Sequence, residues 1–156
     1  MQLKDFPLAW RWTDETYALL PDNVLSRITP QTSEQAARLF RQSLRFCGKE
    51  GLDEKQFSLS QIVTKGIEPA RVSEWLMACH DNPETTVFLS WQSNTAVSTT
   101  WGIFTQYWNE FCYPASDDLN VWSEAHSWAL LYHHEELLQF GPAHLNCHRF
   151  SPLLSE

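Results

Sequence analysis

Tryptophan is the residue that most constrains the fold, because eight of the 156 residues are Trp, beside four Tyr and nine Phe. Each buried indole brings a large apolar surface and one N–H that needs a hydrogen-bond acceptor. Four aromatic residues recur at spacings of three, four and three, which predicts a helix packed on a sheet. These residues are Trp101, Phe104, Trp108 and Phe111. The aromatic content excludes a disordered chain, and the length suits one domain over residues 1–156.

A first helix is predicted upstream of this aromatic stripe. Thr32 and Gln35 have the spacing of a capping box, in which each side chain accepts a hydrogen bond from the other residue's backbone amide. The apolar residues that follow have helical spacing, and Gly48 is well placed to end the helix. We therefore expect a helix over 33–47.

A second helix is expected over 69–80, since Pro69 suits the first position of a helix. Between the two helices, residues 48–67 are polar and contain three glycines, which predicts a loop. The first 30 residues are expected to be irregular or to form short helices.

The C-terminal half alternates between strand and helix. β-Branched and aromatic residues predict a strand over 85–91, ahead of the aromatic helix at 99–111. Residues 119–122 and 127–132 are expected to pair as a hairpin, followed by a short strand at 137–140. We expect an α+β fold in which a small antiparallel or mixed sheet of three to five strands packs against two or three helices. Its C-terminal half has the order strand–helix–strand–strand.

Charge is distributed unevenly along the chain, whose formal net charge is −8. Residues 1–71 hold ten basic and nine acidic side chains, whereas residues 72–156 hold ten acidic side chains and one basic one, Arg149. This balance argues against a nucleic-acid partner, which needs a basic face. Three interpretations of the acidic half are open. It forms a solvated face, it meets a basic protein partner, or the basic N-terminal half folds across it.

The chain is expected to be cytoplasmic. No apolar run approaches the length of a membrane span, so no membrane association is expected, and the N-terminus lacks the apolar region of a signal peptide. The cysteines form no C-x-x-C pair, which favours reduced thiols. They are Cys47, Cys79, Cys112 and Cys147.

Several short motifs resemble a small bacterial family known only as a domain of unknown function. The motifs are TTVFL at 85–89, STTWGIF at 98–104, WNEF at 108–111 and DD at 117–118, with further similarity at 20–21, 28–30 and 36–37. They are chiefly aromatic and apolar, so the resemblance implies shared packing and transfers no catalytic residue. The strand order, the tryptophans and the acidic half also resemble bacterial toxin-immunity proteins of the SUKH type. The chain lacks their early Leu-Pro-x-x-Tyr element and Gly-Gly turn, which leaves a likeness of architecture and charge.

The densest cluster of titratable groups is the run of His133, His134, Glu135 and Glu136. A neutral imidazole beside a carboxylate can act as a general base or a metal ligand, which suggests a small metal-dependent hydrolase. The alternative is a solvated turn between two strands. Cys112 is a further candidate nucleophile if a histidine lies near it, and otherwise a buried thiol.

Two other groups of residues have the chemistry of metal ligands. His144, Cys147 and His148 offer three donors for zinc, but a structural zinc site needs about four, and no second pair completes this set. Asp117 and Asp118 either bind a hard cation or accept backbone hydrogen bonds that fix a turn. We expect no metal and no cofactor.

Because no complete catalytic set is present, we expect a non-catalytic binding or regulatory protein. In the manner of an immunity protein, it presents an acidic surface to a basic protein partner. One of Trp10 and Trp12 is expected to be exposed as an anchor. The acidic contact residues are expected to be Asp117, Asp118, Glu124, Glu135 and Glu136. The alternatives are the metal-dependent hydrolase and a homo-oligomer joined through an aromatic surface.

Overall fold

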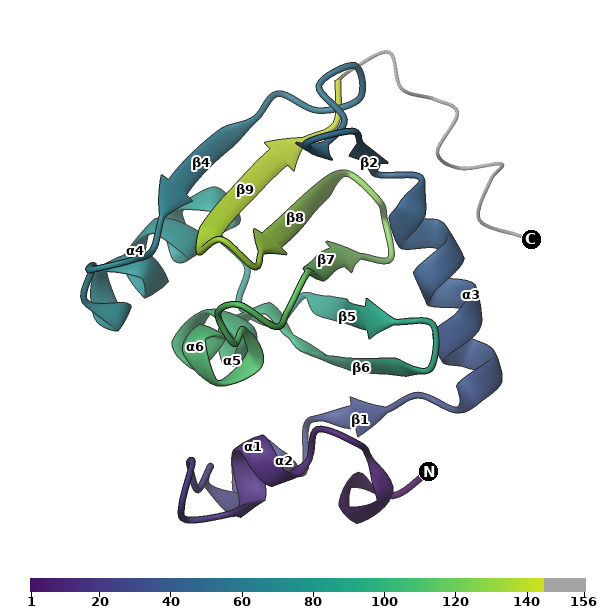
Figure 1. The fold of residues 1–156 in the computed structure, drawn as a ribbon, viewed down its shortest axis with the longest axis vertical. Helices are drawn as coiled ribbons and strands as arrows, with labels where there is room; N and C mark the ends of the chain where they lie inside the picture. Colours follow the sequence, from purple (N-terminus) through teal and green to yellow (C-terminus); the bar gives the residue numbers. More distant parts are fainter. Residues whose placement is uncertain (145–156) are drawn as a thin grey trace.

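The computed structural model, which describes residues 1–144, has an α+β fold with a larger sheet than expected. Seven antiparallel strands form one sheet in the order β1-β6-β5-β7-β8-β9-β4, where the prediction was three to five (Figure 1). β2 and β3 form a separate two-stranded sheet. The strands are β1 Thr29–Pro30, β2 Cys47–Gly48, β3 Gly51–Leu52, β4 Ser60–Val63, β5 Thr86–Gln92, β6 Thr95–Thr100, β7 Leu119–Ser123, β8 Trp128–His133 and β9 Leu137–Pro142.

Residues 1–144 contain six α-helices, of which α3 and α4 are longer than seven residues and the other four are short. Residues 1–28 form short helices joined by turns, as predicted, and strand β1 follows at Thr29–Pro30. Across residues 1–144, no helix combines the length and the hydrophobicity that crossing a bilayer requires. The helices are α1 Trp10–Thr13, α2 Asp22–Leu25, α3 Ser33–Leu44, α4 Pro69–Cys79, α5 Trp101–Gln106 and α6 Trp108–Phe111, with a 3₁₀ turn at Leu3–Asp5.

The predicted capping box of α3 is confirmed. The Gln35 amide donates to the Thr32 hydroxyl at 3.2 Å, and the Thr32 amide donates to the Gln35 side chain at 3.0 Å. The helix ends at Leu44, earlier than predicted, because the chain enters the β2–β3 hairpin at Cys47. Leu44 is consequently 57% exposed instead of packing on the apolar face of the helix.

Two predictions from local sequence were wrong. Residues 95–100 form strand β6, so the helix predicted over 99–111 starts only at Trp101, and it is divided at Tyr107. The sequence of β6 did not indicate a strand, because it consists largely of small and polar residues and lacks the usual alternation of apolar and polar residues. Its position between two neighbouring strands makes it a strand in the folded protein. The predicted loop over 48–67 contains β3 and β4. β4 is an edge strand with mostly exposed residues, which removes its hydrophobic signal.

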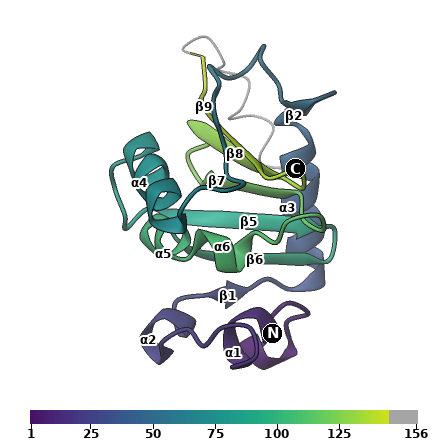
Figure 2. The same ribbon diagram turned by 60° about the vertical axis from the view of Figure 1, so that its left-hand side comes forward.

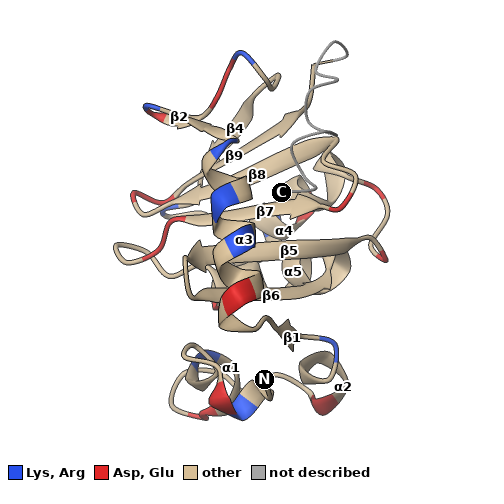
Figure 3. Ribbon diagram, turned by 90° about the vertical axis from the view of Figure 1, so that its right-hand side faces the viewer, with Lys and Arg blue, Asp and Glu red and all other residues tan. Residues whose placement is uncertain are grey.

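The sheet separates two cores, with α3 on one face and α4, α5 and α6 on the other (Figures 2 and 3). Consecutive side chains of a strand point to opposite faces, and β8 shows the consequence. Trp128, Leu130 and Tyr132 join the larger core with α4, α5 and the N-terminal helices. Ala129 and Leu131 join the smaller core under α3. The central strands are buried on both faces of the sheet, so consecutive residues along them are mostly apolar.

The basic N-terminal half partly folds across the acidic half. Arg11 pairs with Asp117 inside the protein, and Arg27 pairs with Glu84 on the surface at 2.9 Å. Other basic residues lie on the outer surface of the protein. A row of exposed arginines follows the outer side of α3 (Figure 3). These are Arg38, Arg41 and Arg45.

Candidate functional site

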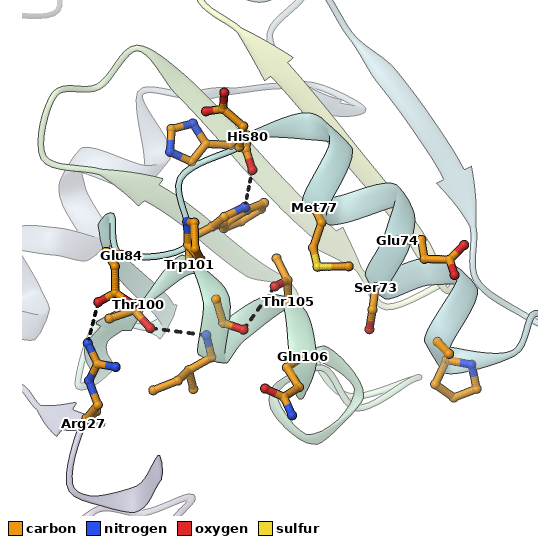
Figure 4. A pocket seen from close by; sticks show the side chains of 16 residues that line it. Arg27, Ser73, Glu74, Met77, His80, Glu84, Thr100, Trp101, Thr105 and Gln106 are labelled. Atoms are coloured by element: carbon orange, nitrogen blue, oxygen red, sulfur yellow. Dashed lines mark hydrogen bonds and ion pairs between the residues drawn. The ribbon is translucent and has the colours of Figure 1, made fainter. Parts of the chain in front are cut away.

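A groove of about 840 Å³ lies between α4 and α5 (Figure 4). Apolar side chains from both helices and from the loop between α4 and β5 line it, among them Trp101, Ile103 and Pro83. Met77 projects from α4 on the side of α5 and is 51% exposed, although methionine is usually buried. The groove therefore offers accessible apolar surface.

Two indole N–H groups fix α4 as one wall of this groove. Trp108 Nε1 donates to the carbonyl of Pro69 at the start of the helix, at 3.0 Å. Trp101 Nε1 donates to the carbonyl of His80 just after its end, at 2.9 Å (Figure 4). Both ends of α4 are thus hydrogen-bonded to the helices that follow β6, and these two indoles each have the acceptor that a buried N–H needs.

The start of α5 forms the opposite wall and lies tightly against Pro83. The Gly102 amide donates to the Pro83 carbonyl at 2.8 Å. A Cβ atom on Gly102 would lie 2.9 Å from the Pro83 Cβ and 3.1 Å from its carbonyl oxygen. Such short distances are repulsive, so glycine at this position permits the close approach. The Thr100 hydroxyl caps the helix by accepting from the Ile103 amide at 3.2 Å.

Three carboxylates and one cation surround the groove. Glu84 forms an exposed ion pair with Arg27, which offsets its charge. Neither Glu74 nor Asp81 has an ion-pair partner within residues 1–144. The groove consequently has an apolar interior and a rim with unpaired negative charge.

Two polar side chains that line the groove, those of His80 and Thr105, already serve the fold. His80 Nε2 is hydrogen-bonded to the Thr85 hydroxyl at 2.8 Å. The Thr105 hydroxyl donates to the Gly102 carbonyl at 3.1 Å. Because these side chains hold α4, α5 and the loop between α4 and β5 in place, the groove has the chemistry of a binding surface more than that of a nucleophilic site.

The His133–Glu136 run lies at the turn between β8 and β9, and the fold brings Asp118 to it. Asp118 Oδ1 lies 2.9 Å from His134 Nδ1 and also accepts a hydrogen bond from the His134 amide at 3.0 Å. The rings of His133 and His134 lie 4.1 Å apart. Glu135 is exposed, and Glu136 closes the turn in a left-handed conformation with φ of 63°.

The pKa of Asp118 is lowered by its contacts with His134. Partial burial by itself would raise this pKa, but hydrogen bonds from the side chain and the backbone of His134 stabilise the carboxylate more strongly. Asp118 is therefore an ionised ligand or hydrogen-bond acceptor at neutral pH.

Two other predicted site residues are buried. Asp117 is 6% exposed and bonded to Arg11, so it is not accessible to a partner, in contrast to the surface role predicted for it. Burial raises the pKa of the Cys112 thiol well above its usual range, assisted by the charge of Asp117. A neutral buried thiol is not a nucleophile. Glu124, by contrast, is exposed between β7 and β8.

The described thiols and the last described histidine have structural surroundings. Cys47, Cys79 and Cys112 are free, and burial raises the pKa of each. His144 is exposed and hydrogen-bonded to Ser58 and to the Glu54 carbonyl. The other two candidate zinc ligands, Cys147 and His148, lie outside the described residues.

Sequence reasoning missed the groove, because its walls come from segments that are adjacent only in the folded chain. One available signal was the position of Met77, which follows the buried Leu76 and therefore points away from the apolar phase of α4. A large apolar side chain on that face indicates a partner or a neighbouring helix.

One family model, described as a protein of unknown function (DUF2947), matches residues 66–141. This segment runs from the residues before α4 into β9. It contains every groove-lining residue except Arg27, together with Asp118, His133 and His134. The upstream motifs at 20–37 lie outside the match. The comparisons give no support to the resemblance to toxin-immunity proteins. No curated protein and no solved structure matches the chain.

Proposed function

We propose that this chain is a non-catalytic binding protein whose groove between α4 and α5 accepts a basic, amphipathic segment of a partner protein. The observation that carries the proposal is the combination of exposed apolar surface at Met77 with the unpaired carboxylates Glu74 and Asp81. An amphipathic helix in an apolar groove is a common mode of peptide recognition.

The two parts of the groove have different physical roles. Burial of Met77 and its apolar neighbours supplies affinity, because apolar surface leaves water on binding. The carboxylates select for Lys and Arg on the ligand and raise the rate of encounter, an effect that salt weakens.

The charge of the surrounding chain supports the same type of partner. No Lys or Arg occurs between Val72 and His148, so the matched segment from Val72 onward repels acidic ligands. Glu124 and Glu135 are exposed within it and add to the negative potential at long range. These residues are expected to steer a partner without contacting it in the groove.

Nuclear magnetic resonance with two synthetic peptides tests this function. Both peptides have the same leucine face of an amphipathic helix, one with lysine and the other with glutamate on its polar face. We expect the lysine peptide to shift the amide signals of α4 and α5 in the labelled protein, and the glutamate peptide to leave them unchanged. Equal shifts with both peptides, or shifts confined to other elements, would contradict the proposal.

A further inference from the structure

We infer that Asp118, His133 and His134 form a binding site for a divalent transition-metal ion of the zinc class. One donor atom from each of the three side chains lies within 4.8 Å of the other two. The site is separate from the groove between α4 and α5 and shares none of its lining residues. A test of metal binding at this site is therefore independent of a test of peptide binding in the groove.

The strand register brings these residues together. In the β7–β8 hairpin, Leu119 pairs with Tyr132, so the next position on each strand places Asp118 opposite His133. His134 follows directly and is held by the hydrogen bond from its own amide to Asp118 and by one from the Ala115 amide to its carbonyl, at 3.0 Å. The donors therefore sit on a backbone that is already hydrogen-bonded.

The type of donor indicates the class of ion. Imidazole nitrogen with one carboxylate oxygen suits zinc, cobalt, nickel or copper, whereas magnesium and calcium require mainly oxygen ligands. Zinc bonds of about 2.0–2.2 Å put tetrahedral donors roughly 3.5 Å apart. All three donors already lie within 4.8 Å of one another, so small side-chain rotations bring them to that spacing.

A fourth ligand is close at hand. The Glu135 carboxylate lies 4.0 Å from His133 Nδ1. His133 is partly exposed, with 31% of its side chain accessible, and His134 with 45%. An ion held by Asp118, His133 and His134 alone would keep one position open to water, whereas coordination by Glu135 as well would complete a tetrahedral shell.

Titration of the untagged full chain with Co²⁺ and Zn²⁺ tests the site. We expect one equivalent of Co²⁺ to give visible absorption bands that Zn²⁺ abolishes, and the imidazole proton signals of His133 and His134 to shift before those of other histidines. No binding, or first shifts at other histidines, would overturn the inference even without a variant.

Variants separate this site from other donors. His134→Gln and Asp118→Asn should each weaken Zn²⁺ binding at least tenfold, as expected when one of three ligands is lost. His144→Gln removes an exposed histidine elsewhere and should leave the affinity unchanged. The double variant Cys147→Ala/His148→Gln should also bind as the wild type does. Loss of binding in this double variant, or equal binding in all variants, would contradict the assignment.

Discussion

Arg11 donates two hydrogen bonds to the carboxylate of Asp117, at 2.6 and 3.1 Å, although 106 positions separate them in the chain. Both side chains are buried, at 5% and 7% exposure. The guanidinium also lies 3.9 Å from the centre of the Tyr113 ring. This pair ties the N-terminal segment, which lies outside the matched family segment, to the loop before β7.

Removing one partner of this pair should destabilise the protein strongly. Arg11→Met leaves the Asp117 carboxylate buried without its cation, which typically costs about 3–5 kcal/mol in the free energy of unfolding. Urea denaturation measures the loss. The double variant Arg11→Met/Asp117→Asn removes the orphaned charge and should recover part of it. A loss below about 1 kcal/mol in the single variant would show that water reaches the carboxylate.

Stability should fall in mildly acidic solution because of His126. This imidazole is 5% exposed, beside Phe46 and Trp122, and burial lowers its pKa to about 4. The unfolded chain binds the proton near pH 6.5 and the folded chain only near pH 4. The free energy of unfolding is therefore highest above pH 6.5 and falls between these values, by about 3 kcal/mol at most.

Thermal or urea unfolding from pH 7 to pH 4 measures this dependence. His126→Asn provides the control, since asparagine tolerates the positive φ of 54° at this position and does not titrate. The variant should show a flatter pH profile than the wild type. Identical profiles would assign the acid sensitivity to other groups.

Local chemistry made much of the fold predictable. The Thr32 capping box located the start of α3, and Pro69 located that of α4, because both signals act within a single turn. Strand β6 was missed because Thr95 and Thr99 are buried although they are polar, and only the packing of the folded protein reveals that burial. The edge strand β4 was missed because most of its side chains are exposed, so its sequence has no apolar pattern.

The two candidate sites differ in the same respect. The β7–β8 hairpin alone places Asp118 opposite His133. A sequence prediction that gives this hairpin its correct register therefore also predicts that the two residues are neighbours. The groove requires the packing of α4 on α5, which depends on Trp101, Trp108 and Gly102 together. No local sequence pattern indicates which helices pack against each other.

The groove should be sensitive to the side chain at position 102. Gly102→Ala gains helix propensity but places a methyl group 2.9 Å from Pro83, and such overpacking usually costs about 1–3 kcal/mol. We expect net destabilisation together with weaker peptide binding. Gly48→Ala, whose added methyl group would meet nothing closer than 3.7 Å, is the matched control. Unchanged stability in Gly102→Ala would mean that α5 moves freely away from Pro83.

Affinity should depend on the exposed methionine of the groove. Met77→Gln keeps the size of the side chain and removes its apolar character, so binding of the lysine peptide should weaken about tenfold, or 1.4 kcal/mol. Leu44→Gln replaces a comparably exposed residue on α3 and should bind as the wild type does. Isothermal titration calorimetry compares the two variants, and equal affinities would exclude Met77 from the interface.

We propose that the rim carboxylates of the groove select a basic partner, and a charge reversal tests this selection most directly. Glu74→Lys/Asp81→Lys should bind the glutamate peptide more tightly than the lysine peptide at low salt, reversing the preference of the wild type. The control Glu15→Lys/Glu54→Lys makes the same change in net charge at exposed positions away from the groove and should keep the wild-type preference. An unchanged preference in the groove variant, or the same reversal in the control, would contradict the account.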